Sequence, residues 1–518
     1  MANTTTTKIE NWNTLHENGP FPSKWLHLTK LDQVSANPVD TYVDAAKEIQ
    51  RLLQQALDAN ESFRAFGSRW SMSHIAHQKE NLHDNSFMNL KIPIVEQHMH
   101  VDADFQHANI FFFQCGNVIR EIHNFLEGFG KSLKSSGASN GQTIAGCIST
   151  GVHGSGLDIG SVQDYVVGLN LIIGPNPEDI VYIERASKPC LSDTFIGSLQ
   201  SRVIRDDGLF NAALVGLGSF GFIHGVTIEV EDLFLLNRYV KEISKENALL
   251  LATTMNFENT AMLIPEEVDS AGRGLRPFHY KIFINPYVQD SHFVVEFMYK
   301  KPYRSNYPDP LPRVQKAIYR DLILLFIKIA EKWNGSIPKL IKILHNSILP
   351  KVDTNVTGML SEIFWDAGYQ GKAFACSVGI DHTDSALALE LLTKLAKDEG
   401  PIPGIYAMRF VKQSKANFAF TRFPITCMLE IDGIIWNGAA HGMISLERFC
   451  TRIIETLQAN NIPFTIHWGK NADWSFPALL SHMYGDDVMQ WNHYRSELLS
   501  VQSQKLFSNK FLEDIGLA

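Results

Sequence analysis

The stretch of residues 135–156 constrains the fold of this chain most strongly, because small residues crowd there around a single imidazole. Its sequence is SSGASNGQTIAGCISTGVHGSG, and the imidazole is that of His153. Glycine allows the backbone to approach another group closely, or to take dihedral angles that a Cβ atom forbids. A second loop with glycine and hydroxyl side chains, residues 64–71, lies upstream. Both loops are typical of chains that hold a large ligand.

Residues 146–156 resemble the flavin-domain signature of the vanillyl-alcohol-oxidase superfamily, in particular its branch of alditol oxidases, aldonolactone oxidases and covalent-flavin cholesterol oxidases. The loop at residues 64–71 is similar to the pyrophosphate loop of that family, and the two loops occur in the family's order. The resemblance is strong over residues 1–233 and at the C-terminal end, and thin in between. It implies an α+β fold, with a two-part PCMH-type FAD-binding domain and an α/β substrate-binding cap domain.

The resemblance also implies where the domains begin and end. The FAD-binding domain covers residues 1–233, the cap domain residues 234–471, and a C-terminal return to the FAD-binding domain residues 472–518. Apolar residues with helical spacing at 43–56 predict a helix before the first loop. Beyond the FAD-binding domain, long alternating segments indicate a sheet with one buried face. The polar residues 1–37 are expected to wrap the surface.

A flavin dinucleotide carries a doubly charged pyrophosphate, which converging backbone N–H groups bind well. Gly67, Ser68 and Ser71 offer open backbone and hydroxyl groups, and Arg69 adds a cation. Alone, this loop would be an ordinary surface turn, but together with the glycine-rich stretch it favours a cofactor site. The resemblance implies FAD contacts from Ala65, Phe66, Gly67, Ser68, Arg69, Trp70, Ser71, Ser139, Thr143, Gly146, Thr150, Gly151, His153, Ser155 and Ile223. For His153 the alternative is a buried imidazole that shapes the loop.

Trp70 departs from the family pattern. Many members of the branch have a histidine there that is joined covalently to the flavin, and the indole nitrogen is not suited to that bond. His74 and His77 are nearby but out of register. The sequence therefore predicts FAD held without a covalent bond. Ala138 stands where alditol oxidases have a substrate-facing serine, which argues against a simple polyol substrate.

Two further segments carry the predicted chemistry. Residues 406–410 align with the Glu-x-Arg pair of the family, and residues 466–470 with its His-Trp-Gly-Lys motif. The resemblance implies catalytic roles for Arg409, Lys470 and His467. Cations near the flavin ring stabilise the negative charge that develops during hydride transfer. The family's glutamate is Ala407 here, which leaves the proton acceptor open among His467, Glu296 and Glu430.

Two other motifs have simpler explanations. Residues 216–221 have a GxGxxG spacing, but a Rossmann fingerprint needs a strand before it and a helix after it, and the pattern here is the opposite. His98, His100, Asp102 and Asp104 alternate as ligands on one face of a strand would, yet no third cluster completes a zinc site. We therefore expect neither a Rossmann nucleotide site nor a metal.

The composition excludes some classes of partner and leaves one segment open. A net charge of −9 gives no reason to expect nucleic acid. No apolar run approaches the roughly 18 residues of a membrane-spanning helix, and the N-terminus has no apolar signal core. Six cysteines far apart in sequence are typical of a reduced, cytoplasmic protein.

Residues 313–333 are apolar, with lysine and arginine residues at intervals. This pattern fits either a core-packed helix of the cap or a helix that meets lipid.

The predicted function is FAD-dependent oxidation of a CH–OH carbon of a small organic or lipophilic substrate, with O2 as the acceptor. One alternative is a dehydrogenase that uses another acceptor. A second is a flavin-binding protein that no longer oxidises anything, which Trp70, Ala138 and Ala407 leave open. Arg409 and Lys470 argue against this second alternative, because a site that no longer oxidises a substrate does not need two converging cations.

Overall fold

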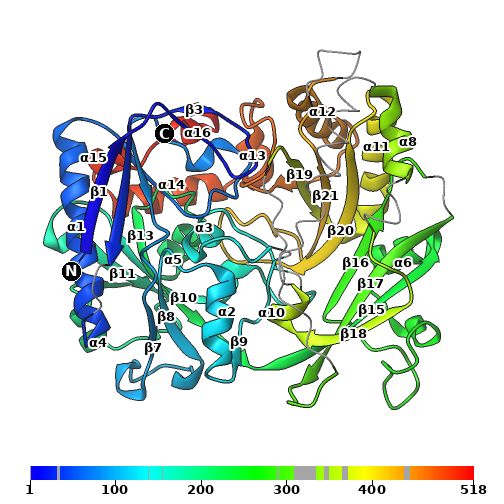
Figure 1. Cartoon of the computed structure of the whole chain (residues 1–518), viewed down its shortest axis with the longest axis horizontal. Coiled ribbons are helices and arrows are strands. Elements are labelled where there is room, and N and C mark those ends of the chain that lie inside the picture. The colour runs from blue at the N-terminus through cyan, green and yellow to red at the C-terminus, as the bar shows by residue number, and fades with distance from the viewer. Residues whose placement is uncertain are drawn as a thin grey trace.

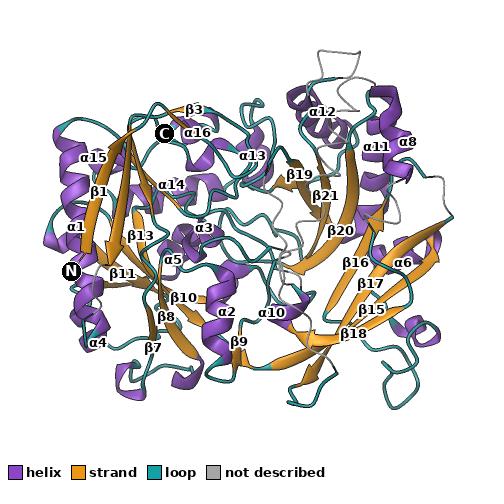
Figure 2. Ribbon diagram, viewed as in Figure 1, coloured by secondary structure: helices purple, strands orange, loops and turns teal. Residues whose placement is uncertain are grey.

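The strands of the computed structural model form three main sheets, two in the N-terminal half of the chain and one in the middle of the chain (Figure 1, Figure 2). The structure describes residues 2–31, 35–137, 139–154, 156–288, 291–308, 334–343, 349–364, 371–436 and 444–518. The predicted helix at 313–333 lies outside the described residues, as do Ala138 and Ser155.

The first sheet carries the loop at residues 64–71. Its four strands are, in order, β1 (Ala2–Lys8), β4 (Trp25–Leu31), β6 (Asn81–Asp84) and β5 (Phe63–Phe66). Helix α1 (Pro38–Asp58) precedes β5, as the helical spacing predicts. The Asn37 side chain caps it by accepting the Val39 N–H, and Pro38 takes a first-turn position where an N–H is not needed. The capped helix therefore fixes the position at which the chain enters β5.

The second sheet lies behind the glycine-rich stretch. Its six strands are, in order, β12 (Arg202–Arg205), β11 (Ile180–Glu184), β10 (Val166–Ile172), β13 (Phe222–Glu229), β8 (Ile110–Gln114) and β7 (Lys91–Pro93). The glycine-rich stretch is not a loop throughout, because Ile144–Ser149 form the short helix α3. Residues 216–221 follow α5 (Asp207–Leu214) and lead into β13, so the helix precedes and the strand follows, which confirms that this is no Rossmann fingerprint.

The third sheet belongs to the middle of the chain. Its eight strands are, in order, β18 (Thr354–Met359), β15 (Phe234–Ser244), β17 (His292–Pro302), β16 (His279–Ile284), β20 (Gly404–Lys412), β21 (Ile425–Gly433), β19 (Phe374–Asp381) and β22 (Phe464–Ile466). In the antiparallel register of β20 and β21, Ala407 lies opposite Glu430 and Ile405 opposite Asp432. Because side chains alternate along a strand, these four residues share one face of the sheet. Helices α11 (Ser385–Asp398) and α12 (Leu446–Ala459) lie beside the sheet (Figure 1).

The described residues within 1–37 lie largely at the surface, and they also form strands and long-range contacts. Strands β1 and β4 pair along their whole length, and β1 is an exposed edge strand. Its run of four threonines is polar, but threonine is β-branched and suits an edge strand well. Further along, the Leu15 N–H donates to the Arg69 carbonyl at 2.8 Å, and the Ala373 N–H donates to the His16 carbonyl at 3.4 Å. This segment therefore joins the first loop to the middle sheet.

The C-terminal segment packs on the N-terminal half, where red and blue meet in Figure 1. It contains α14 (Asp487–Leu498), α15 (Val501–Leu506) and α16 (Lys510–Asp514). His74 Nε2 lies 3.0 Å from an Asp514 carboxylate oxygen, and the Asn509 amide donates to the Ile75 carbonyl at 3.0 Å. The end of the chain thus supports the segment that follows the first loop.

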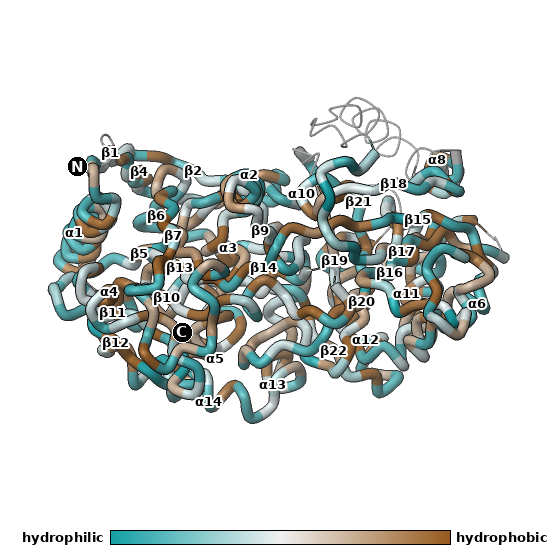
Figure 3. The backbone as a smooth tube through the Cα atoms, turned by 90° about the horizontal axis from the view of Figure 1, so that it is seen from below, coloured by the Kyte–Doolittle hydropathy of each residue, from teal (hydrophilic) through white to brown (hydrophobic). Residues whose placement is uncertain are grey.

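Hydrophobic segments of the described chain are short and are interrupted by hydrophilic ones (Figure 3). Within the described residues, each helix is too short or too polar to cross a lipid bilayer.

Candidate functional site

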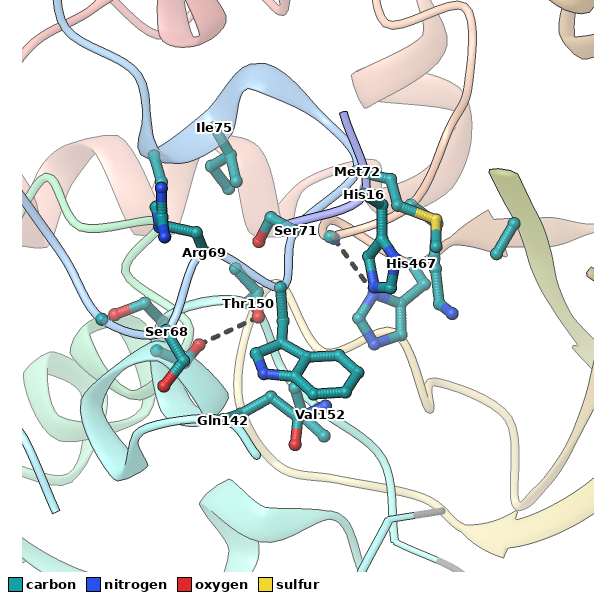
Figure 4. Close-up of a pocket in the computed structure, with 18 of the residues that line it drawn as sticks. His16, Ser68, Arg69, Ser71, Met72, Ile75, Gln142, Thr150, Val152 and His467 are labelled. Atoms are coloured by element: carbon teal, nitrogen blue, oxygen red, sulfur yellow. Dashed lines mark hydrogen bonds between the residues drawn. The ribbon is translucent and has the colours of Figure 1, made fainter. Parts of the chain in front are cut away.

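A cavity of about 610 Å³ lies where the first loop, the glycine-rich stretch and the middle sheet meet. Ligand sites have volumes of roughly 300–1,000 Å³. The predicted residues that line it are Ala65, Phe66, Gly67, Ser68, Arg69, Trp70, Ser71, Ser139, Thr143, Gly146, Thr150, His153, Ile223, Arg409, His467 and Lys470. Figure 4 shows Ser68, Arg69, Thr150 and His467 around this space. Segments far apart in the sequence are therefore brought together, as the prediction required.

Two predicted residues stand apart from this set. Ser155 lies outside the described residues. Gly151 does not line the cavity, although the sequence predicts a cofactor contact for it. Its φ of 61° is in the left-handed region, and a Cβ there would lie 3.5 Å from Val215, behind the cavity wall. Glycine at this position therefore serves the turn after α3.

Arg64 fixes the first loop from beneath. It is buried and donates from Nη1 to the Gly218 carbonyl at 3.0 Å, and from Nη2 to the Ile75 carbonyl at 2.7 Å and to the Leu217 carbonyl. Burial, assisted by the charge of Arg495, lowers the pKa of Arg64 to about 9. A cation that is bonded to carbonyls in this way holds the loop, the 217–218 turn and the C-terminal segment in one arrangement.

The first loop and the glycine-rich stretch pack directly on each other. A Cβ on Gly67 would lie 1.9 Å from Thr143 Oγ1, and a Cβ on Gly141 would lie 2.4 Å from the Trp70 ring. Arg69 holds a φ of 60°, which is uncommon for a residue with a side chain. The two backbones can approach this closely only because glycine stands at both contacts. The N–H groups and hydroxyls of both loops are thereby concentrated on one side of the cavity.

Arg409 and Glu430 form a buried ion pair at the other side. Arg409 donates from Nε to Glu430 Oε2 at 2.8 Å and from Nη2 to Oε1 at 2.6 Å. Burial favours the neutral form of each partner, but their mutual charge outweighs it: the pKa of Glu430 falls well below its ordinary value and that of Arg409 rises. Arg409 Nη1 has no hydrogen-bond partner in the described structure. One donor of the guanidinium is therefore left for a ligand.

His153 lies against this pair. Its Nδ1 is 3.0 Å from the Gly154 carbonyl, so Nδ1 carries the proton, and its Nε2 is 3.4 Å from Arg409 Nη2. Burial first, and then the charge of Arg409, lowers the pKa of His153. The same Nε2 lies 3.5 Å from Glu430 Oε1, so the ring contacts both members of the ion pair.

His467 and Lys470 reach the cavity from the segment after β22. The Gly469 N–H donates to His467 Nδ1 at 3.0 Å, the bond drawn beside His467 in Figure 4. Burial lowers the pKa of His467 well below its ordinary value, with smaller contributions from His153 and Lys470. Because Nδ1 accepts, the neutral ring carries its proton on Nε2 and can only donate there. Gly469 also accepts from the Met72 N–H at 2.8 Å, which ties this segment to the first loop.

Two of the three candidate proton acceptors fail on geometry. Glu296 is not a lining residue and lies 3.2 Å from His279 Nε2 in a separate cluster with Arg238. The ring of His467 is a donor toward the cavity. Glu430 lines the cavity and lies on the strand opposite Ala407, but both its oxygens are occupied by Arg409. The geometry therefore identifies Glu430 as the partner of Arg409.

The structure adds lining residues that the sequence analysis missed. His16 enters from the N-terminal segment, with its ring 5.4 Å from that of Trp70, and burial lowers its pKa to about 4. Gln142 lies in the glycine-rich stretch, and its Oε1 is buried without a hydrogen-bond partner in the described structure. Asp432 lies two residues beyond Glu430 on β21. Two carboxylates at alternate positions of an apolar strand were a usable signal for this last residue.

Comparison with known proteins finds relatives by sequence over part of the chain. A D-arabinono-1,4-lactone oxidase of Candida glabrata is 27% identical over 203 residues, which are 39% of this chain and 34% of that protein. L-gulonolactone oxidase 3 of Arabidopsis thaliana is 36% identical over 121 residues, which are 23% of this chain and 18% of that protein. The matched region thus spans about a third or less of these relatives. No family model matches the chain.

Comparison with solved structures covers almost the whole chain. A solvent-stable cholesterol oxidase has a TM-score of 0.70 at 12% identity and covers 99% of this chain and 98% of its own. The cholesterol oxidase from B. sterolicum has a TM-score of 0.67 at 12% identity, with coverage of 99% and 97%. The relatives by sequence and the neighbours by structure are members of the vanillyl-alcohol-oxidase flavoproteins, which confirms the predicted family resemblance and the PCMH-type α+β fold.

Proposed function

We propose that the chain is an FAD-dependent oxidoreductase that removes hydride from a CH–OH carbon and holds FAD without a covalent bond. One observation carries the proposal: the two loops and the cations Arg409 and Lys470 line a single cavity. Lactone oxidases among the relatives and cholesterol oxidases among the structural neighbours support this reaction class. The proposed FAD-binding part is residues 1–233 with 472–518, and the proposed cap is residues 234–471.

The lining fits a flavin dinucleotide. Ser68, Ser71 and Thr143 supply hydroxyls, and the two loops supply N–H groups for a pyrophosphate. The partnerless Gln142 Oε1 and Arg409 Nη1 are buried polar atoms that a ligand would satisfy. When bound, FAD supplies the two-electron acceptor. The protein's part is then to orient the substrate, exclude water and stabilise charge.

Arg409 and Lys470 would stabilise negative charge that develops in the cavity as hydride leaves the substrate. The Arg409–Glu430 pair keeps the guanidinium fixed, so little reorganisation is needed when the charge appears. His467 would donate from Nε2 to the same region. The roles of Arg409 and His467 are supported by their hydrogen-bond partners, and that of Lys470 by its place in the cavity lining.

We propose O2 as the electron acceptor. A dehydrogenase with another acceptor is the second candidate, because an L-galactono-1,4-lactone dehydrogenase of Brassica oleracea is 22% identical over 241 residues. Val152, which lines the cavity beside His153, would control the access of oxygen. Six cysteines without a disulfide in the structure support our proposal of a cytoplasmic location.

The absence of a covalent bond rests on Trp70 and on the positions of the nearby histidines. His74 is engaged with Asp514, and His77 Nε2 lies 2.8 Å from the Pro22 carbonyl. We expect yellow protein whose colour stays in the supernatant after acid precipitation. Colour in the pellet would show a covalent bond, and His16→Ala would then test the histidine that lies beside Trp70.

The function itself is tested with purified holoenzyme. We expect anaerobic addition of an alcohol substrate to bleach the flavin absorbance, and air to restore it with consumption of O2. Bleaching that is reversed only by an artificial acceptor would identify a dehydrogenase. Folded protein that takes up no FAD after incubation would refute the proposal.

A further inference from the structure

The wall of the cavity that the middle sheet provides is mainly apolar. In the described structure, the apolar residues on this side are Phe374 and Ala375 of β19, Ile405 of β20, and Ala373, Pro403 and Ile434 next to these strands. A hydroxyl that is buried against such a wall without a partner costs about 1–3 kcal/mol. A sugar lactone or polyol carries several hydroxyls, so this wall favours a substrate with an apolar body.

Asp432 is the exception on this wall. It lies at the end of β21 between Ala375 on β19 and Ile405 on β20. Its carboxylate has no hydrogen bond or ion pair in the described structure; it is surrounded by protein but open to the cavity, whereas Glu430 on the same face is paired with Arg409. Because Asp432 lines the cavity, this free carboxylate is available to a molecule inside it.

Lys470 faces the same space from the segment after β22. The two side chains form no salt bridge in the described structure, but burial raises the pKa of Asp432 and the charge of Lys470 opposes this rise more than any other neighbour does. An ammonium group donates and a carboxylate accepts. A hydroxyl group does both, so one hydroxyl fits between the two side chains. A substrate carboxylate would instead be repelled by Asp432.

We propose that Asp432 is the proton acceptor of the reaction, and that Asp432 and Lys470 select an alcohol whose remaining body is apolar. This inference rests on the proposed function. As the C–O single bond becomes C=O, the hydroxyl proton passes to an Asp432 oxygen and the carbon loses a hydride, which carries both electrons and for which bound FAD would be the acceptor. Lys470 holds the oxygen throughout. Asp432 thus takes the place that Ala407 leaves without a carboxylate.

The surroundings of Asp432 set the pH range in which it accepts a proton. Burial raises its pKa above the ordinary value of 3.8, and the charge of Glu430 adds to this, while Lys470, Arg409 and Lys281 oppose it. A base works only when it is ionised, so the rate of flavin reduction should fall as the pH drops through this raised pKa.

The test compares wild type, Asp432→Asn and Asp432→Ser as holoenzymes, with Glu390→Gln on the exposed surface of α11 as the matched carboxylate-to-amide control. Anaerobic stopped-flow follows flavin bleaching by 1-decanol, cholesterol in detergent micelles and D-arabinono-1,4-lactone. We expect wild type to react at least about tenfold faster with one of the two apolar alcohols than with the lactone. Both Asp432 variants should keep the flavin spectrum but react about 100-fold more slowly, without the acid limb of the pH profile. The control should match wild type.

A second readout does not depend on turnover. Titration of the dithionite-reduced wild-type holoenzyme, which cannot accept hydride, with cyclohexylmethanol or with the lactone is followed anaerobically by the change in reduced-flavin absorbance, and we expect the apolar alcohol to bind more tightly. Asp432 variants that reduce flavin at the wild-type rate, or a wild type that prefers the lactone, would overturn this inference and leave the proposed function standing. Wild-type flavin that no alcohol or lactone bleaches would overturn both.

Discussion

The two walls of the cavity are built in different ways. On the side of the N-terminal half, backbone packs on backbone, and a Cβ on Gly67 would come within 1.9 Å of Thr143 Oγ1. On the side of the middle sheet, regular strands present a mainly apolar surface with a few charged side chains, of which Arg409 and Glu430 are paired at 2.6 Å. The first wall depends on the absence of a Cβ atom at its glycines, and the second wall depends on the charges of its side chains. Changes in the first should therefore abolish ligand binding, and changes in the second should alter the rate.

The largest effect is expected for Gly67→Val. Its Cβ would collide with Thr143, which belongs to the wall itself, so the two loops would have to separate. We expect insoluble or colourless protein, measured as soluble yield and as the ratio of flavin to protein absorbance. Gly197→Val is the matched control, because a Cβ at Gly197 meets nothing within 4 Å. Yellow Gly67→Val protein with the wild-type ratio of flavin to protein absorbance would contradict the claim that ligand binding depends on the close approach of the two loops.

The second prediction concerns the buried ion pair. Arg409→Met leaves the Glu430 carboxylate buried without its partner, which should lower the free energy of unfolding by about 3–5 kcal/mol and slow flavin reduction about 100-fold. The double variant Arg409→Met with Glu430→Leu should recover most of the stability and none of the rate. Urea unfolding and anaerobic reduction measure the two effects separately. Recovery of both would mean that the pair has a structural role alone. The exposed Arg273→Met serves as control and should unfold as wild type does.

Sequence alone could predict the first wall well, because each loop is a continuous motif. Residues 65–71 and most of the predicted residues at 139–153 line the cavity, and so do Arg409, His467 and Lys470. Among the described predictions, Gly151 and the candidate proton acceptor Glu296 lie outside the cavity lining. A local pattern also predicted α1, since this helix depends on its own periodicity.

Which side chains of the second wall lie beside each other could not be predicted, because this depends on strand register. That Glu430 faces Ala407 follows only when β20 and β21 pair as they do, and a shift of one residue would turn Glu430 to the other face. His16 was missed for a similar reason. Its place in the cavity comes from long-range hydrogen bonds of its own segment to Arg69 and Ala373, which leave no local pattern.

The third prediction separates charge from packing on the second wall. Lys470→Met should slow flavin reduction about 100-fold. The unfolding midpoint should stay near wild type, because Lys470 has no ion pair in the described structure whose loss would leave a buried charge. Lys412→Met, at the exposed end of β20, is the matched control. A loss of stability as large as that of Arg409→Met would show that the two cations do not differ in this way.

The smallest effect is expected from pH, and it should fall on the N-terminal half. His83 is fully buried between Thr29 Oγ1 at 2.8 Å and Asn85 Oδ1 at 2.7 Å, and burial lowers its pKa from 6.5 to about 3. Below pH 6.5 the unfolded chain binds a proton there that the folded chain does not. Stability is therefore complete above 6.5 and is lost as the pH falls toward about 3.

One such histidine lowers the free energy of unfolding by about 1.4 kcal/mol per pH unit well inside this window. His83→Gln keeps the capacity for both hydrogen bonds and removes the titration, so its unfolding free energy should fall less steeply between pH 6 and pH 4, roughly by that amount. Urea titrations at several pH values measure the slope, with the exposed His107→Gln as control. An unchanged slope in His83→Gln would mean that the acid sensitivity arises elsewhere, for instance at His224, whose pKa burial lowers to about 4. Because both histidines belong to the sheets behind the first wall, acid should release the cofactor by loosening that wall before it disturbs the Arg409–Glu430 pair.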